Sequence, residues 1–233
     1  VCYDHVYRTR VPTLNQELGP LHRRLWVALR YLWDRKGPLA CGATHASGFV
    51  SSRDGLDRSN IQLYFTPSSY ELTLVKPDPF PGIMVGFSNC RPTSLGSVEI
   101  KSESPFDHPA IQPNLLATQH DITEMLEGAR FIRKLSMTPQ LASVIAVEIK
   151  PGLSIQLDAD MEADIRARSY SVFHPCCTAR MGADGVVDEK LRVRGVDGLR
   201  VIDASVFPNS ISGNINGPTM MVGWKGAALV MNS

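Results

Sequence analysis

The spacing of the glycines is the sequence feature that most restricts the fold of this chain. The chain has 18 glycines, and no two of them are separated by a single residue. The fingerprint G-x-G-x-x-G, which brings a dinucleotide pyrophosphate close to the backbone at the start of a helix, therefore cannot occur. The pattern G-x-x-x-x-G-K-[ST] is also absent. By themselves, these residues predict neither a dinucleotide-binding βαβ unit nor a phosphate loop.

Charge and cysteine content narrow the class of protein further. The 24 Lys and Arg residues nearly balance the 23 Asp and Glu residues, and the formal net charge is +1. Without a basic stripe, nothing favours a nucleic-acid partner. The five cysteines lack the regular spacing of a disulfide framework, which is typical of reduced thiols. We therefore expect a cytoplasmic protein, with peripheral membrane association left open and targeting segments before Val1 undecided.

Helices are predicted from apolar residues that recur at spacings of three and four. The predicted ranges are 16–35, 122–135, 161–168 and 218–230. Thr13 and Gln16 form a capping-box pattern before the first helix, and Gly37 and Pro38 supply its stop. Asp121 is the expected N-cap of the second helix.

Strands are predicted where short apolar runs are bounded by Gly, Pro, Asp and Asn. These runs are 47–50, 61–66, 83–88 and 97–101, followed by two short ones at 191–193 and 199–202. Leu63 and Phe65 alternate with more polar neighbours, as in an antiparallel sheet with one covered face. Strands grouped before helices indicate an α+β fold, in which helices cover an antiparallel sheet.

His174 is the histidine most suggestive of chemistry. Pro175 follows it and disfavours the helical conformation, so His174 should lie on an extended or turn segment, where an imidazole can act as a base. The simpler interpretation is a structural or surface histidine. Cys176 and Cys177 add possible metal ligands, but no second ligand pair lies nearby, and we predict no metal site.

A second candidate region runs from Asp203 to Thr219. A strand ends at Asp203, and a loop with Asn214 and Asn216 leads to a helix that has Pro218 in its first turn. Free backbone N–H groups at such a helix start favour an anion or an electron-rich oxygen. A helix start behind an ordinary loop is the equally acceptable alternative.

Four spaced motifs between residues 173 and 230 resemble one family. The motifs are His174-Pro-x-Cys177-Thr178-x-x-Met181-Gly182, Gly185-Val-Val-Asp188 with Leu191-Arg-Val-x-Gly195-Val, Leu199-Arg-Val-Ile-Asp203-Ala-Ser-x-x-Pro208, and Gly213-Asn214-x-Asn216-x-Pro218-Thr219. In this order they resemble the C-terminal signature of the glucose–methanol–choline (GMC) flavin oxidoreductases. Upstream agreement is looser but collinear, so the resemblance covers nearly the whole chain and only the later half of the family's sequence.

The resemblance implies FAD-dependent oxidation of an alcohol to an aldehyde or ketone. His174 matches the base that removes the hydroxyl proton while a hydride passes to flavin N5. Asn214 matches the second catalytic position, where it can hydrogen-bond the substrate oxygen but cannot act as a base. The resemblance also implies cofactor-binding residues, namely Asp203 and Ala204 near the ribityl–pyrophosphate part and Asn216, Pro218 and Thr219 at the start of the last helix, with Asn216 and Thr219 beside the pyrimidine edge of the flavin.

The same resemblance implies two domains and three partners. Residues 1–172 would form a substrate-binding domain, and residues 173–233 would complete an FAD-binding domain whose N-terminal half is absent from this sequence. The expected partners are a small-molecule alcohol, the missing FAD-binding half, and oxygen or a quinone as electron acceptor. We expect the fragment alone to be inactive.

The substrate and two other function classes stay open. The motifs around Cys177 and Asn214 most resemble choline dehydrogenase-like alcohol dehydrogenases, so a choline-like or another primary alcohol is expected. Candidates to surround a quaternary nitrogen are Tyr64, Phe65, Tyr70 and Glu71. The alternatives are a hydroxynitrile-lyase-like enzyme on the same scaffold and a non-catalytic truncated relative.

Overall fold

The computed structural model describes residues 1–71 and 76–232, which divide into two compact units. The first unit combines residues 1–89 with residues 122–170, and the second combines residues 90–121 with the chain from Ser171 onward. The second unit thus includes a segment from the middle of the predicted substrate-binding range 1–172. The roles assigned to the ranges 1–172 and 173–233 remain predictions.

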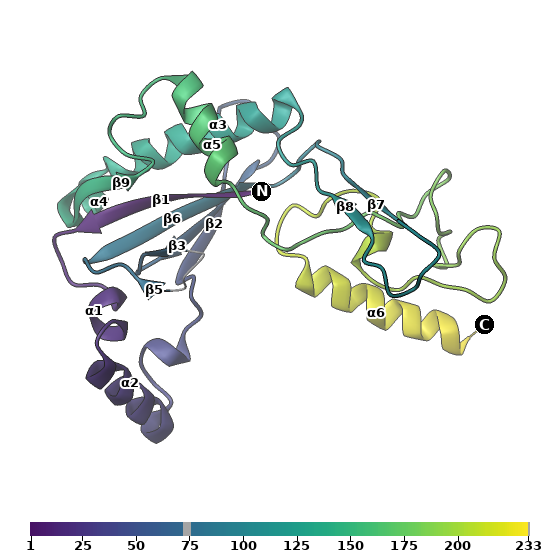
Figure 1. Ribbon diagram of the computed structural model, residues 1–233, viewed down its shortest axis with the longest axis horizontal. Coiled ribbons are helices and arrows are strands. Elements are labelled where there is room, and N and C mark those ends of the chain that lie inside the picture. Colours follow the sequence, from purple (N-terminus) through teal and green to yellow (C-terminus); the bar gives the residue numbers. More distant parts are fainter. Residues whose placement is uncertain (72–75, 233) are drawn as a thin grey trace. The chain divides into compact units, whose positions relative to one another are not determined.

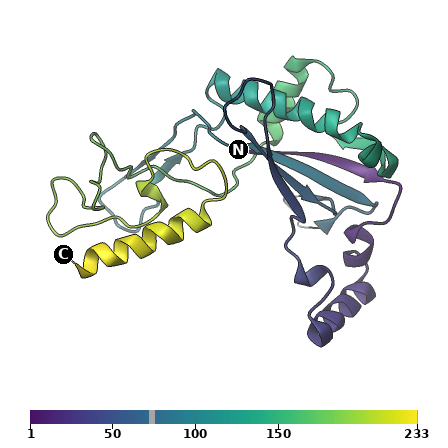
Figure 2. The ribbon, with the colours of Figure 1, turned by 180° about the vertical axis from the view of Figure 1, so that it is seen from behind.

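A five-stranded antiparallel sheet forms the centre of the first unit, as Figures 1 and 2 show. Its order is β2-β3-β6-β1-β9, and its strands are β1 (Cys2–Thr9), β2 (Ala46–Val50), β3 (Ile61–Thr66), β6 (Gly82–Asn89) and β9 (Ile145–Lys150). A separate pair joins β4 (Tyr70–Glu71) to β5 (Lys76–Pro77). The α+β class and three of the predicted strands are confirmed, whereas β1 and β9 were not predicted.

Helices α3 and α5 lie over one face of this sheet (Figure 1). The bounds are α3 (Gln119–Ser136), α5 (Asp158–Arg168) and the short α4 (Pro139–Val144). Apolar side chains of α3 are buried, with Ile122 and Met125 at most 1% exposed. Gly128 brings this helix against β6, because a Cβ there would overlap the Phe87 ring. The helix therefore covers the sheet at very close range.

The helix prediction at Asp121 was wrong in detail. The helix begins two residues earlier, at Gln119, and places Asp121 in its first turn. The Asp121 carboxylate instead accepts hydrogen bonds from the backbone N–H groups of Thr93 (2.8 Å) and Ser94 (3.0 Å). Burial raises the pKa of Asp121, but these hydrogen bonds outweigh it and lower the pKa overall. Asp121 thus fixes a loop rather than capping its own helix.

Charged side chains are buried beside β1 and join it to its neighbours. Arg133 of α3 donates to both carboxylate oxygens of Glu148 on β9, at 3.2 and 2.7 Å. His5 Nδ1 on β1 lies 3.8 Å from the same carboxylate, and the His5 side chain is fully buried. Burial raises the pKa of Glu148, but hydrogen bonds from His5 and Arg133 outweigh it and lower the pKa from 4.5 to about 2. Glu148 is therefore a buried carboxylate held ionised by its partners.

A second polar contact ties α5 to the same strand. Arg168 donates to Asp164 (2.6 Å) and to the Tyr3 hydroxyl (2.7 Å), and its guanidinium lies over the Tyr3 ring. The Tyr170 hydroxyl donates to Asp4 at 2.7 Å. Tyr3 and Asp4 are adjacent in β1 and point to opposite faces of the sheet, so side chains bond this strand on both faces.

The predicted helix 16–35 is two helices in the structure. Helix α1 (Leu14–Leu18) and helix α2 (Leu21–Asp34) are separated at Gly19 and Pro20, because Pro20 lacks an N–H and itself takes an extended conformation. The capping interaction is present, since the Thr13 N–H donates to Gln16 Oε1 at 2.9 Å. The 3₁₀ turn η1 (Pro38–Ala40) follows α2.

The second unit packs one long helix against loops and a short strand pair. Helix α6 (Asn216–Met231), the 3₁₀ turn η2 (Ala204–Val206), and strands β7 (Ser97–Glu99) and β8 (Ala110–Gln112) are its regular elements. Predicted strand 97–101 therefore pairs with β8 outside the main sheet. The runs 191–193 and 199–202 form only isolated bridges, such as Arg192 with Arg200. The last helix begins at Asn216, two residues before the predicted start.

A glycine sets the distance between α6 and the chain before η2. The core here contains Val187, Leu191, Val206, Phe207 and Val222. A Cβ at Gly226 would overlap Ile202, whereas a Cβ at Gly223 would meet nothing within 4 Å. The two glycines of one helix therefore differ in what an added methyl group would contact.

Replacing Glu148 with Gln should lower the free energy of unfolding by about 3 kcal/mol at pH 7, as expected for a pKa lowered from 4.5 to about 2. Because folding lowers this pKa, the contribution of Glu148 is complete above about pH 4.5 and is lost as the pH falls toward 2. Urea unfolding at several pH values measures the difference. Glu162→Gln, which removes a half-exposed ion pair with Arg166, should cost less than about 1 kcal/mol. If both variants lost the same free energy of unfolding, Glu148 would not be a buried carboxylate held ionised by its partners.

Replacing Gly226 with Ala should lower the free energy of unfolding of the second unit by about 1–3 kcal/mol, because the methyl group overpacks against Ile202. Gly223→Ala should raise it by up to about 1 kcal/mol, because alanine favours a helix and the site has room. Thermal unfolding followed by circular dichroism compares the two variants. A stabilising Gly226→Ala would show that the helix is packed differently.

Candidate functional site

The segment around His174 has an unusual backbone. Phe173 and Cys177 have φ values of 57° and 71°, in the left-handed region that costs energy for residues other than glycine. His174 lies between them, outside helix and strand, and its side chain is half-buried. The predicted non-helical position of His174 is confirmed. Strained backbone of this kind persists where surrounding structure fixes it, and it is common at functional sites.

Backbone hydrogen bonds fix the chain that follows His174. The N–H groups of Cys177, Ala179 and Met181 donate to the carbonyls of three consecutive residues, Ala204, Ser205 and Val206, at 3.4, 3.0 and 2.9 Å. Cys176, Cys177 and Ala204 also pack against the core of the second unit. The motif of His174 and the motif of Asp203 therefore form one rigid arrangement.

Asp203 turns the chain at the start of η2. Its carboxylate accepts a hydrogen bond from the Ser205 N–H at 2.8 Å, and its side chain is exposed. One carboxylate oxygen is thus used to shape the turn. The second remains available for a ligand group that carries a hydroxyl donor.

The start of α6 offers two backbone donors. Pro218 has no N–H, and the Thr219 N–H already donates to the Ile215 carbonyl at 2.9 Å. The first-turn donors that can face a ligand are therefore the N–H groups of Asn216 and Gly217. Asn216 and Gly217 are both exposed, so these donors belong to surface residues. The sequence predicted free backbone N–H groups at this helix start, and the structure identifies them as those of Asn216 and Gly217.

The Thr219 hydroxyl is bonded within its own helix. It donates to the Ile215 carbonyl at 2.8 Å, so its hydrogen is used there. Thr219 can still accept a hydrogen bond from a ligand N–H. The placement of Thr219 beside the pyrimidine edge of a flavin remains a prediction.

His174 and Asn214 both belong to the second unit. Their chain neighbours Cys176, Cys177 and Ile215 pack against the same core. The candidate site residues between 174 and 219 therefore belong to one packed unit. The roles of His174 and Asn214 as a catalytic pair remain a prediction.

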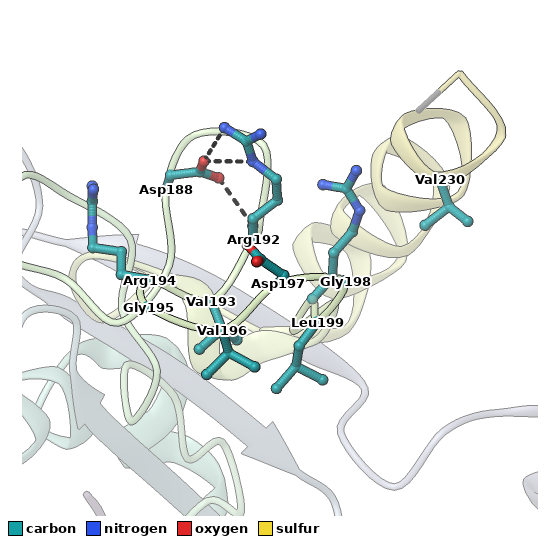
Figure 3. A pocket seen from close by; sticks show the side chains of 11 residues that line it. Asp188, Arg192, Val193, Arg194, Gly195, Val196, Asp197, Gly198, Leu199 and Val230 are labelled. Carbon is teal, nitrogen blue, oxygen red and sulfur yellow. Dashed lines mark hydrogen bonds and ion pairs between the residues drawn. The ribbon is translucent and has the colours of Figure 1, made fainter.

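A hollow of about 770 Å³ lies elsewhere in the same unit, between the loop 192–200 and Val230 (Figure 3). Its cationic side chains are engaged, since Arg192 pairs with Asp188 at 2.7 Å and Arg194 donates to the Gly182 carbonyl. None of the predicted site residues lines it. We therefore place the candidate site at His174, Asp203 and the start of α6, and not at this hollow.

The vicinal cysteines contact each other. Their sulfur atoms lie 3.3 Å apart, and both residues are free cysteines. Burial, followed by the hydrogen bond that Cys177 donates to Cys176, raises the pKa of Cys177 to about 12. Within residues 1–71 and 76–232, no group of three or more His, Cys, Asp or Glu side chains is arranged to hold a metal.

The candidate residues for a substrate cation do not form one cage. Tyr64 and Phe65 are neighbours on β3, so their side chains point to opposite faces of the sheet. The Tyr64 hydroxyl is 3.1 Å from Ser88 Oγ on β6. At most one of these two aromatic rings can face a given ligand.

Comparison with known proteins identifies the family. A sequence model described as GMC oxidoreductase matches residues 92–223. Mouse mitochondrial choline dehydrogenase is 35% identical over 226 residues, which cover 95% of this chain and 38% of the relative. An alcohol dehydrogenase [acceptor] of Pseudomonas putida is 36% identical over 203 residues, covering 86% of this chain and 37% of the relative.

Solved structures agree with this result. A formate oxidase from Aspergillus oryzae, studied for the modification of its FAD, superposes with a TM-score of 0.88 at 26% identity, over 99% of this chain and 46% of that one. The chain spans less than half the length of these relatives. The motifs between residues 173 and 230, the common core that carries them and these similarities lead to one conclusion: the chain belongs to the GMC oxidoreductase family.

Proposed function

We propose that this chain is the substrate-binding and C-terminal part of an FAD-dependent enzyme that oxidises an alcohol to an aldehyde or ketone. The observation that carries the proposal is the common core of the second unit. That core holds the His174 segment, the turn at Asp203 and the start of α6 in one body. An alcohol oxidation needs a proton acceptor and a hydride acceptor at the same carbon, which such a body can align.

The donors at the start of α6 fit the electron-rich edge of a flavin. The N–H groups of Asn216 and Gly217 belong to exposed residues at a helix start. The helix dipole adds partial positive charge at the same place. The exposed Asp203 carboxylate fits a ribityl hydroxyl, because its second oxygen is free to accept. The donor set therefore agrees with FAD, which when bound would accept the hydride.

His174 and Asn214 act on the substrate oxygen in this proposal. The His174 imidazole removes the hydroxyl proton, and the resulting alkoxide is a better hydride donor than the alcohol. The Asn214 side chain, which cannot take up a proton near neutral pH, orients the same oxygen by a hydrogen bond. The strained backbone at Phe173 and Cys177 supports a fixed position for the imidazole between them.

The exposed apolar side chains of α6 favour burial by a further polypeptide. This helix is apolar on all sides, with Lys225 as its charged residue, and a helix of that kind is normally buried. Met220 and Trp224 are nevertheless 68% and 82% exposed. We propose that the FAD-binding half found in longer family members covers this surface, and that the fragment alone is inactive. The electron acceptor is oxygen or a quinone.

Replacing His174 with Ala in the protein completed by its FAD-binding half should lower kcat for alcohol oxidation by about 10²–10⁴-fold, the range of general base catalysis. The flavin absorbance should remain, since His174 is not proposed to hold the cofactor. The exposed His108, changed to Ala, is the matched control and should retain its activity. A His174→Ala enzyme with normal kcat would rule out the base.

Anaerobic addition of an alcohol separates oxidation from a lyase reaction on the same scaffold. An oxidation transfers two electrons to FAD, so one equivalent of substrate should abolish the visible absorbance of the oxidised flavin. A lyase leaves the flavin oxidised and forms its products without bleaching. Product formation with unchanged flavin absorbance would replace the proposed reaction by the lyase.

A further inference from the structure

Helix α2 carries an exposed apolar face. Leu21, Leu25, Leu29 and Leu32 follow one another at helical spacing, and each is 59–72% exposed. Trp33, beside this row, is 92% exposed. In Figure 1 the helix lies at the end of the first unit away from α3 and α5, without another element on its outer side.

The same helix is strongly basic along the borders of that face. Successive residues of a helix are rotated by about 100° around its axis, which places Arg24 beside one edge of the leucine row. The other edge of the apolar face is formed by Trp26 and Trp33, and Arg23 and Arg30 lie next to them. Between residues 21 and 36 there are five Lys and Arg side chains and one acid, Asp34, although the whole chain has a net charge of only +1. Val27, on the opposite side, is buried.

The arginines of this helix are not neutralised by tight ion pairs. Arg23 and Arg24 donate to the backbone carbonyls of Gln16 and Leu18, which leaves their charge in place. Arg30 approaches Asp34 only to 3.9 Å, and both side chains are partly exposed. The face therefore combines a wide apolar surface with uncompensated positive charge at its edges.

We propose that α2 lies in the surface of a membrane that contains anionic phospholipids. A helix with Leu and Trp on one face and arginines at its borders inserts the apolar face below the headgroups and pairs the cations with phosphates. A second copy of the same helix is a poorer occupant, because the two basic borders would repel each other. In the described ranges, 1–71 and 76–232, no helix has the length and apolarity needed to cross a bilayer. A helix that lies in the interface contacts one leaflet.

Vesicle flotation of the intact protein tests the proposal. Vesicles of phosphatidylcholine alone are compared with vesicles of phosphatidylcholine and phosphatidylglycerol, at low salt and at about 1 M salt, where the Debye length is only about 3 Å. Binding is expected to the anionic vesicles at low salt and to weaken at high salt. Leu32→Ser should lower the partition coefficient about tenfold or more. Arg30→Gln should lower it about fivefold on anionic vesicles.

Leu153→Ser is the matched control, because Leu153 has the same 66% exposure as Leu32 and lies outside α2. It should bind vesicles like the unchanged protein. Equal binding by the Leu32→Ser variant would overturn the proposal. So would absence of vesicle binding together with a dimer, seen by sedimentation, that Leu32→Ser dissociates, since a second copy would then cover the face.

Discussion

Strand β1 places polar and charged side chains where water cannot reach them, and the first unit depends on how they are compensated. Its His5 lies near Glu148, and Glu148 is in turn bonded by Arg133, so β1, β9 and α3 share one buried polar network built around the Arg133–Glu148 ion pair. Removing one partner from such a set leaves another charge buried and unpaired, which costs far more than the set contributes when complete. The position of β1 between β6 and β9 is therefore specified by electrostatics as well as by backbone pairing.

The sequence was sufficient for elements whose apolar residues repeat regularly. Strands β3 and β6 and helix α3 were predicted close to their observed bounds, since their burial follows from that repeat. Strand β1 was missed because its buried positions include Asp4 and His5, which no apolar pattern reveals. The periodicity of α2 correctly predicted a helix, but a pattern defines a face without saying what covers it. Partners distant in sequence, such as Arg133 and Glu148, had no local signal.

At the candidate site, too, the sequence predicted some features and not others. Pro175 correctly predicted the non-helical position of His174, and the motif spacing alone identified the family. The hydrogen-bonding state of each group could not be predicted in this way. The Thr219 hydroxyl is bonded to its own helix, and the usable donors are backbone groups at Asn216 and Gly217, which every sequence possesses at a helix start.

The pairing of β1 with β9 also affects the order in which this chain can fold. Tyr7 pairs with Glu148, and Cys2 bridges Tyr170, so the earliest and latest parts of the first unit are neighbours in its sheet. Contacts between such remote positions close slowly, because the loop entropy is lost before the contact forms. During synthesis, one edge of β1 must wait for residues near 150 to leave the ribosome. A chaperone that shields this edge in the nascent chain would therefore act while the edge is still unpaired.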